Sequence, residues 1–308
     1  MKRSFPREYK NICSYRKFLY LTDKILHTMK NSFILFTVLF STLLSAHAQN
    51  VNDPYRLTVG EYEVYILTEG GGDGNTGILI DAPAEVLEKY APEGTFPIAT
   101  HAVLVKGKGT VVLIDTGYGR QLFQHLEKLG VTPEEIERVL LTHMHGDHIG
   151  GMFRNGAKAF PNADVILSKR EHAYWSEAGN AGALKVLSEY GEKITTVEPS
   201  TIGDDTHDGI LAMAAYGHTP GHIMFHIQDG GERLLIWGDL THALAVQMPH
   251  PEISVTYDVD PGVARASRLE VLEYVVREGI PVAGMHIPIP GAGTVTQSGT
   301  GYVFLPGN

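Results

Sequence analysis

The stretch "LLTHMHGDHIGG", residues 140–151, carries three histidines and one aspartate within six residues. A surface loop gains nothing from such crowding, because protonated imidazoles held close together repel one another. Side chains at positions i and i+2 of an extended segment face the same way, so His143 and His145 can reach one metal ion together. Asp147 and His148 follow a glycine, whose missing Cβ allows a sharp turn toward a second position. The alternative is a chance cluster in a chain with 15 histidines.

Three further candidate ligands each follow an apolar run that is typical of a strand. They are His218 in "YGHTPGH", Asp239 in "LLIWGDLTH" and His286 in "PVAGMHIPIPG". Taken singly, these residues are a loop histidine, a turn aspartate and a half-buried histidine. Because strand ends at one edge of a sheet layer can converge, the three together with the 143–148 cluster predict a metal site. Imidazole and carboxylate ligands suit zinc, and iron, manganese or cobalt also accept this set.

Short apolar, β-branched runs alternate with helical patterns along the chain. Strands are predicted within residues 62–70, 77–83, 102–115, 139–142, 163–168, 209–217 and 223–240, with a closing strand at 280–286. Helices are predicted within residues 120–130, 132–138, 169–177 and 260–279. The hairpins favour two mixed sheets packed between helices, and a doubly wound parallel sheet is the alternative. Residues 49–308 are expected to form a single domain, since no internal repeat or linker interrupts them.

The ordered set of motifs resembles the metallo-β-lactamase superfamily. The matching elements are "IDTG" with Asp115, "THMHGDH" with His143 to His148, "GHTPGH" with His218, "GD" with Asp239, and the late His286. The resemblance implies an α/β fold, a four-layer αββα sandwich of two mixed sheets flanked by helices. It also implies two metal positions: His143, His145 and His218 for one, Asp147, His148 and His286 for the other, with Asp239 bridging both. Asp115 would orient ligands without binding metal.

The activity implied by this resemblance is that of a dinuclear metal-dependent hydrolase. Two divalent ions, zinc first and manganese, iron or cobalt as alternatives, would lower the pKa of bound water from about 15.7 towards about 7. A metal-bridging hydroxide would then attack a carbonyl or phosphoryl centre. Asp147 and Asp239 are the expected catalytic carboxylates, Asp239 as the bridge and Asp147 to orient the hydroxide or relay a proton. No nucleophile-elbow motif occurs in the chain.

Within the superfamily, the chain is similar to the methyl parathion hydrolase and N-acyl-homoserine lactone lactonase branches. The similarity lies in residues 237–268, 284–293 and 299–306. The expected substrate is therefore a small neutral ester or lactone, with acyl-homoserine lactones among the candidates, and a phosphotriester is the alternative. Class B β-lactamases generally lack a bridging aspartate, which argues against a β-lactamase. A metal-binding protein without catalysis is a further alternative.

Four other residues have two interpretations each or a supporting role. Trp175 and Phe160 either line an apolar pocket or belong to the core. His242 either supports the ligands or is a loop residue. His222 is expected to support the site without binding metal.

The N-terminal segment has the layout of a secretory signal. Residues 29–48 begin with Met29 and a lysine, continue through an apolar run and end in Ala46-His47-Ala48. The run is shorter than the roughly 20 apolar residues that a spanning helix needs, which argues against a stable membrane anchor. We expect residues 1–48 to be an N-terminal extension plus signal, with Met29 as an alternative start. Cleavage near Ala48 and export to the periplasm or the extracellular space would follow.

Charge and cysteine content limit the partners. Residues 1–48 hold eight basic and two acidic residues, so the formal net charge goes from −10 for the whole chain to −16 for the remainder. Such an acidic domain repels phosphate backbones, so a small-molecule substrate is expected and a nucleic acid is not. The single cysteine, Cys13, lies in the removed segment, which excludes cysteine ligands and disulfides from the rest. A homodimer is expected only by analogy with the related branches.

Overall fold

The computed structural model describes residues 53–199, 204–207 and 209–307. These residues belong to one compact unit that spans Asn50–Asn308. The predicted N-terminal extension and signal, residues 1–48, lie outside the described residues. Among the helices that are described, none has both the length and the apolar character needed to cross a bilayer.

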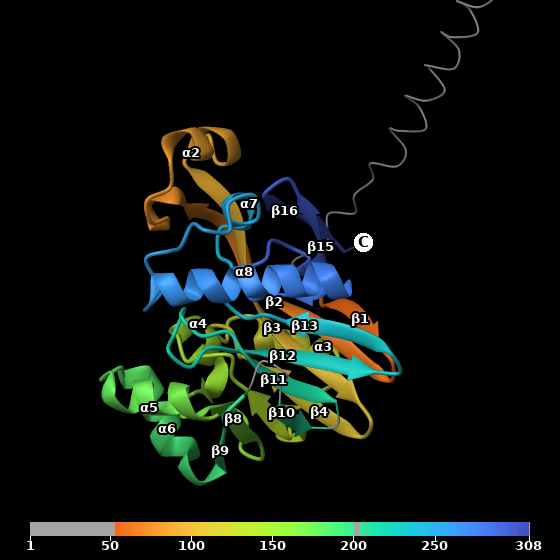
Figure 1. The fold of residues 1–308 in the computed structure, drawn as a ribbon. Helices are drawn as coiled ribbons and strands as arrows, with labels where there is room; N and C mark the ends of the chain where they lie inside the picture. The colour runs from red at the N-terminus through yellow and green to blue at the C-terminus, as the bar shows by residue number, and fades with distance from the viewer. Residues whose placement is uncertain (1–52, 200–203, 208, 308) are drawn as a thin grey trace, which may run out of the picture. The chain divides into compact units, whose positions relative to one another are not determined.

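Two seven-stranded sheets form the centre of the described domain (Figure 1). The first sheet has the order β1-β2-β3-β4-β5-β8-β9 and the second the order β10-β11-β12-β13-β14-β15-β16. The strands of the first sheet are β1 (Tyr55–Val59), β2 (Tyr62–Asn75), β3 (Thr95–Gly107), β4 (Thr110–Ile114), β5 (Arg138–Leu140), β8 (Asp164–Ser168) and β9 (Ile194–Val197). Those of the second sheet are β10 (Asp204–His207), β11 (Ile210–Ala214), β12 (Ile223–Asp229), β13 (Glu232–Ile236), β14 (Val282–Ala283), β15 (Ala292–Ser298) and β16 (Gly301–Pro306). Both sheets are mixed, because β4, β5, β8 and β9 pair in parallel in the first and β13 and β14 do so in the second.

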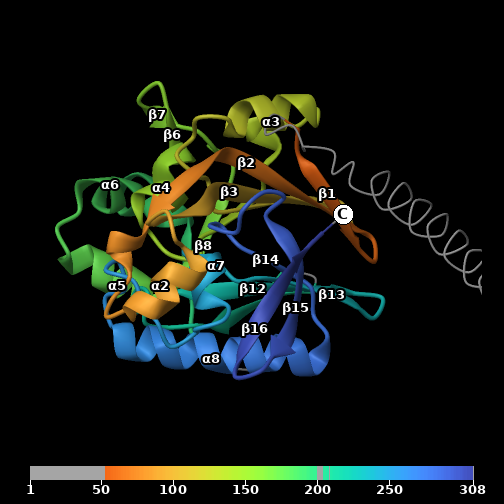
Figure 2. The ribbon, with the colours of Figure 1, turned by 90° about the horizontal axis from the view of Figure 1, so that it is seen from above.

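Helices cover the outer faces of the two sheets. The α-helices are α2 (Ala84–Tyr90), α3 (Leu122–Lys128), α4 (Gly146–Ile149), α5 (Lys169–Glu177), α6 (Ala181–Tyr190), α7 (Leu244–Gln247) and α8 (Pro261–Glu278). Short 3₁₀ turns lie at η1 (Thr76–Ile78), η2 (Pro133–Glu135), η3 (Gly150–Met152) and η4 (Gly191–Lys193), and β6 (Phe153–Arg154) pairs with β7 (Ala157–Lys158). Figure 2 shows α8 on one side of the sheets and α3 on the other.

Three buried apolar clusters explain this layering. One joins the facing sides of the two sheets, with Val64 of β2 and Phe225 of β12 among its members. A second packs α3 and α6 on the outer face of the first sheet. A third packs α8 on the outer face of the second sheet through Leu272 and Val275. The described domain is therefore a four-layer αββα sandwich, as predicted, and the doubly wound alternative is wrong.

Several predicted elements are confirmed and three need correction. The long helix α8 begins with Pro261 and ends before Gly279, whose φ of 63° suits a left-handed C-terminal cap. The strand predicted at residues 77–83 is wrong: Leu79 makes only an isolated bridge, and its side chain packs against the cluster between α2 and α7. The helix predicted after Thr132 is only the 3₁₀ turn η2. The predicted closing strand is also not the last, because the hairpin of β15 and β16 follows it.

The strands β2 and β3 extend beyond the rest of their sheet. β1 pairs with β2 only as far as Ile66, and β4 pairs with β3 only from Val103 onward. Residues 67–75 and 95–102 therefore form a two-stranded arm, with a register shift between Thr68 and Gly70. The base of this arm lies against the loop after β14, since the amide of His101 donates to the carbonyl of Met285.

Candidate metal centre

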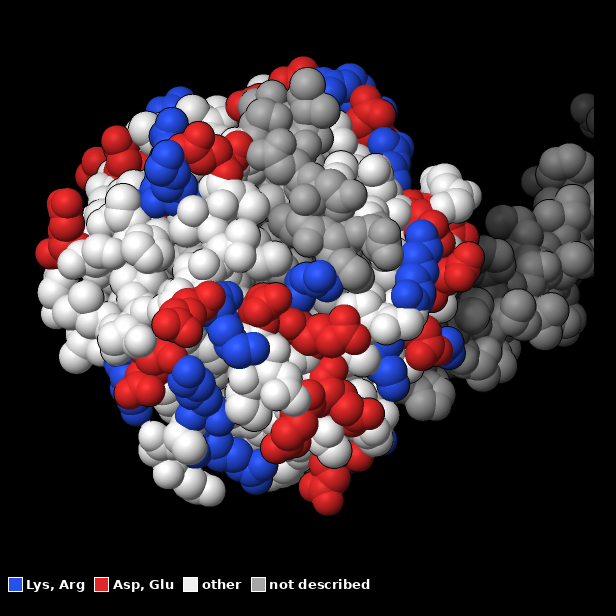
Figure 3. All heavy atoms as spheres, turned by 90° about the horizontal axis from the view of Figure 1, so that it is seen from below, with Lys and Arg blue, Asp and Glu red and all other residues white. Residues whose placement is uncertain are grey.

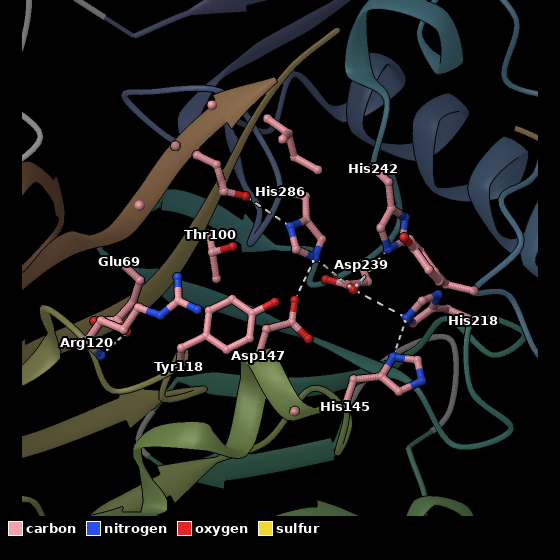
Figure 4. Close-up of a pocket in the computed structure, with 17 residues that line it drawn as sticks. Glu69, Thr100, Tyr118, Arg120, His145, Asp147, His218, Asp239, His242 and His286 are labelled. Atoms are coloured by element: carbon pink, nitrogen blue, oxygen red, sulfur yellow. Dashed lines mark hydrogen bonds and ion pairs between the residues drawn. The ribbon is translucent and has the colours of Figure 1, made fainter. Parts of the chain in front are cut away.

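The structure brings all seven predicted ligands together at the ends of strands. His143 and His145 follow β5, Asp147 and His148 lie in α4, His218 follows β11, Asp239 follows β13 and His286 follows β14. The predicted ligands form two groups whose ligand atoms lie within 4.8 Å of one another: His143, His145, His218 and Asp239, and then Asp147, His148 and His286. A third group of this kind joins His242 to Asp239 and His286. Figure 4 shows His145, His218 and Asp239 pointing toward one another, with Asp147 and His286 beside them.

Asp239 lies between the two groups. Its Oδ2 is 3.3 Å from Nε2 of His218, and its Oδ1 is 3.2 Å from Nε2 of His148. Oδ2 is also 3.2 Å from Nε2 of His286. One carboxylate therefore faces ligands of both groups.

The hydrogen-bond pattern directs bare ring nitrogens into the centre. Nδ1 of His218 donates to Asp258, Nδ1 of His148 donates to Asp115, and Nδ1 of His286 donates to the carbonyl of Ala99. With these protons on the outer nitrogens, the inner Nε2 atoms of the neutral rings carry the lone pairs that a metal ion binds.

The crowding of these inner nitrogens is the test of whether the residues fit a metal. Nδ1 of His145 lies 2.9 Å from Nε2 of His143 and 3.0 Å from Nε2 of His218. Nδ1 of His145 carries at most one proton and can donate only one of these two hydrogen bonds. When all three rings are neutral, at least one contact therefore brings two lone pairs face to face. Nε2 of His148 and Oδ1 of Asp239 are buried with no hydrogen-bond partner among the described residues. Such a donor set fits divalent cations such as zinc.

Asp115 holds two of the ligand histidines through one carboxylate. Its Oδ2 accepts from Nδ1 of His148 at 2.7 Å and from the hydroxyl of Thr142 at 2.6 Å. That hydroxyl in turn accepts from Nδ1 of His143 at 3.1 Å. Asp115 has a φ of 54°, which is uncommon for a residue other than glycine. The carboxylate thus orients a histidine from each group of ligands.

Asp258 plays the corresponding part for His218, and the sequence pattern did not reveal it. Its Oδ1 accepts from His218 Nδ1 at 2.9 Å, and its Oδ2 lies 3.5 Å from the fully buried guanidinium of Arg268 in α8. Arg268 also donates to the carbonyls of Leu240, Pro251 and Ile253. The arginine therefore fixes the loop that carries Asp258.

Two more histidines border the ligands. Nε2 of His222 accepts from the backbone amide of Asp239 at 3.0 Å, so His222 holds Asp239 in place and is not part of any of these ligand groups. His242 lies closer to the centre than the sequence indicated, because its Nε2 donates to Asp239 Oδ2 at 3.1 Å and its ring stacks on that of His286. Both rings are buried.

Glu171 is a buried carboxylate beneath the site that the sequence reasoning missed. It accepts from the amide of Met144 at 3.0 Å, from the hydroxyl of Thr219 at 2.6 Å and from the indole of Trp175. It also accepts from the amide of Gly221 at 3.2 Å. Burial raises the pKa of Glu171, and these hydrogen bonds oppose that rise.

In the metal-free chain, the pKa values of the ligand histidines shift in opposite directions. Burial lowers the pKa of His145 to about 4, and burial with the neighbouring histidines also lowers that of His143. For His286, burial would lower the pKa, but Asp239 and Asp147 outweigh it and raise the pKa to about 10. Burial would raise the pKa of Asp147, but His148 and His286 keep it below its usual value. Asp147 is therefore ionised at neutral pH.

The ligands form the floor of a cavity of about 660 Å³. The cavity is lined by Glu69, Gly70, Gly71, Gly72, Ile98, Ala99, Thr100, Tyr118, Arg120, His145, Gly146, Asp147, His218, Asp239, His242, Tyr257 and His286. Trp175 and Phe160 are not among the lining residues; both lie in the core cluster under the first sheet. Of the two interpretations for these aromatics, the core is correct.

Solved structures with this fold cover most of the chain. A hydrolase named AbOPH of the beta-lactamase superfamily superposes with a TM-score of 0.74 at 27% identity, over 83% of this chain and 97% of that one. AidC, described as a dizinc quorum-quenching lactonase in complex with a product, superposes with a TM-score of 0.73 at 26% identity, over 83% and 98% of the two chains.

Curated relatives match over shorter stretches. A ribonuclease of Thermus thermophilus is 29% identical over 175 residues, which are 52% of this chain and 39% of that protein. A hydroxyacylglutathione hydrolase of an Enterobacter species is 32% identical over 124 residues, 40% of this chain and 41% of that protein. The chain thus spans less than half the length of either relative. The sequence profile of the metallo-beta-lactamase superfamily matches residues 95–278, more than half of the chain. The chain therefore belongs to the metallo-beta-lactamase superfamily of hydrolases.

Proposed function

We propose that this chain is a dinuclear metal-dependent hydrolase that cleaves a small neutral ester or lactone. The observation that carries the proposal is the position of Asp239, whose carboxylate lies between the two groups of predicted ligands and faces members of both. His143, His145 and His218 would hold one ion, and Asp147, His148 and His286 the other, with zinc as the expected metal. Bound there, the ions would supply Lewis acidity and water activated at neutral pH.

The side chains around this centre have separate tasks in such a reaction. Asp147 is ionised and faces the cavity, so its carboxylate can accept a proton from the attacking water or orient it. His242 is neutral, since burial lowers its pKa to about 4, and it donates to Asp239. Asp239 is thereby held in one orientation toward both ligand groups. The hydroxyl of Tyr118 points toward Asp147 in Figure 4 and lies where it can donate to a substrate oxygen.

The cavity suits a neutral substrate. Among the described residues that line it, Arg120 is the one lysine or arginine, whereas Glu69, Asp147 and Asp239 are acidic. The Arg120 guanidinium lies 4.5 Å from the centre of the Tyr118 ring, so part of its charge faces an aromatic surface. Besides the proposed metal ions, a substrate with several phosphates would find only one cationic side chain, Arg120, among the described residues of the lining. The likeness to the lactonase AidC supports a lactone as the substrate.

A nucleic-acid substrate is less suited to this surface, although one relative is a ribonuclease. The formal net charge of the whole chain is −10. On the face seen in Figure 3, acidic and basic side chains are interspersed and no basic stripe crosses it. Tight binding of a phosphate backbone generally needs such a stripe.

A metal analysis followed by a substrate panel tests the proposal. Zinc-loaded protein should hydrolyse a short-chain aryl ester or an N-acyl-homoserine lactone, chelation should abolish the activity, and added zinc should restore it. Paraoxon in the same panel tests the alternative of a phosphotriesterase, and oligoribonucleotides test the ribonuclease alternative. A sample with bound metal but without hydrolysis of any ester or lactone would overturn the proposed activity.

We further propose that the protein is exported, which fractionation of the native host would test.

A further inference from the structure

Three consecutive glycines of β2 line the cavity beside the ligands. We call Gly70, Gly71 and Gly72 the glycine wall. A Cβ atom added at Gly70 or Gly72 would have no heavy atom within 4 Å, and neither residue has a positive φ. The fold therefore does not need glycine at these two positions, because a side chain would have space there and the backbone conformation would allow it.

The next glycine in the same strand is different. A Cβ added to Gly74 would lie 2.5 Å from a ring carbon of Phe96, a side chain that is buried. Gly74 is therefore required by packing within the arm. Since glycine weakens a strand interior, its presence where packing does not need it often marks a place where a ligand approaches the main chain.

The glycine wall is close to the proposed reaction centre. Gly71 pairs with Ala99 of β3, and the carbonyl of Ala99 accepts from Nδ1 of the ligand His286. Glu69, which precedes the wall, accepts from the amides of Arg120 and Gln121 and so holds the loop with Tyr118 and Arg120 over the same cavity. Figure 4 shows the strand crossing one side of the cavity, with Tyr118 and Arg120 near its lower end.

We infer that the glycine wall is a specificity determinant, the surface against which the acyl group of the substrate packs. The inference rests on the proposed function. A wall without side chains leaves room beside the scissile bond for an extended apolar acyl chain, whereas a short acyl group does not need that room. The substrate class is thereby narrowed to esters or lactones of medium- or long-chain carboxylic acids.

Substitutions that add bulk to the wall test this inference. The zinc-loaded wild type, Gly72→Ala, Gly72→Val and Gly70→Val are compared on 4-nitrophenyl acetate and 4-nitrophenyl decanoate, and on N-butanoyl- and N-decanoyl-homoserine lactone. The valine variants should lower kcat/KM for the decanoyl substrates by about 10- to 100-fold, and for the short ones by less than about threefold. Gly72→Ala should lie between wild type and valine.

Metal content and thermal unfolding serve as controls. Gly70 and Gly72 variants should keep the wild-type metal content and unfolding midpoint, whereas Gly74→Ala should lower the midpoint because its Cβ meets Phe96. An equal loss of kcat/KM for short and long substrates would overturn the inference and leave the proposed hydrolase intact. A wild type that hydrolyses no member of the panel would overturn the proposed function, and the inference with it.

Discussion

The buried carboxylate of Glu171 accepts a hydrogen bond from the backbone amide of Met144, the residue between His143 and His145. Its other oxygen accepts from the hydroxyl of Thr219, which follows His218. One side chain on α5 therefore holds both loops that carry the three histidines of the first group. Groups that orient metal ligands in this way commonly change metal affinity when they are removed.

Replacement of Glu171 should weaken metal binding without removing a ligand. Glu171→Ala leaves the amides of Met144 and Gly221 without their acceptor, and we expect metal affinity to fall by about 10- to 100-fold. Glu171→Gln should lose less, since an amide oxygen still accepts from Met144 while its NH₂ group meets the amide of Gly221. Competition with a fluorescent chelator measures the affinity. The exposed Glu198, which pairs with Lys169, provides the control Glu198→Gln, and a loss as large in that variant would contradict the role of Glu171.

Replacement of Asp258 and replacement of Asp115 should weaken different metal positions of the centre. Asp258 is hydrogen-bonded to one ligand histidine, His218, so Asp258→Asn should weaken one metal position, by roughly 10- to 100-fold. Asp115→Asn disturbs the bond to His148 and, through Thr142, the bond to His143, so both positions should weaken. Zinc content after dialysis against graded chelator distinguishes the two. Identical release curves for the two variants would disagree with the hydrogen bonds described above.

Removal of metal should destabilise the fold as well as abolish activity. A ligand that binds only the folded state at about 100 times its Kd stabilises it by about 2.7 kcal/mol. Chelated protein should therefore unfold several degrees lower than the zinc-loaded form, by scanning calorimetry, and added zinc should reverse the shift. His218→Ala should show a smaller shift than wild type, because one ligand is missing. An unfolding midpoint that is indifferent to zinc would argue against metal binding at these residues.

Phe160 should act on stability and not on substrate choice. The side chain is fully buried in the cluster under the first sheet and stacks with Phe123, away from the cavity lining. Phe160→Ala should lower the free energy of unfolding by about 3–5 kcal/mol, the usual range for a buried aromatic. Urea denaturation measures this loss. The ratio of kcat/KM between long and short substrates should stay at the wild-type value, and a changed ratio would place Phe160 in the substrate pocket after all.

The local sequence pattern was sufficient to predict most of the helices and strands that it covered. Helix α8 could be located from its proline and glycine ends, and the hairpins of β3–β4 and β12–β13 from alternating apolar runs joined by glycine-containing turns. The strand prediction for residues 77–83 was wrong because an apolar run has the same composition whether it pairs in a sheet or packs in a loop cluster. The β15–β16 hairpin was missed because its exposed edge strand alternates only weakly.

The sequence by itself determined the chemical kinds of side chain at the strand ends, and so the expectation of a metal centre in this protein. Asp115 and His222 were also expected from the motifs as supporting residues, but the tertiary structure alone revealed Asp258 and Glu171. Asp258 lies 40 positions from His218, and Glu171 lies 27 positions from Met144. Nothing in the local pattern distinguishes such carboxylates from solvated ones, because a hydrogen bond between distant residues depends on how sheets and helices pack and not on neighbours in the chain.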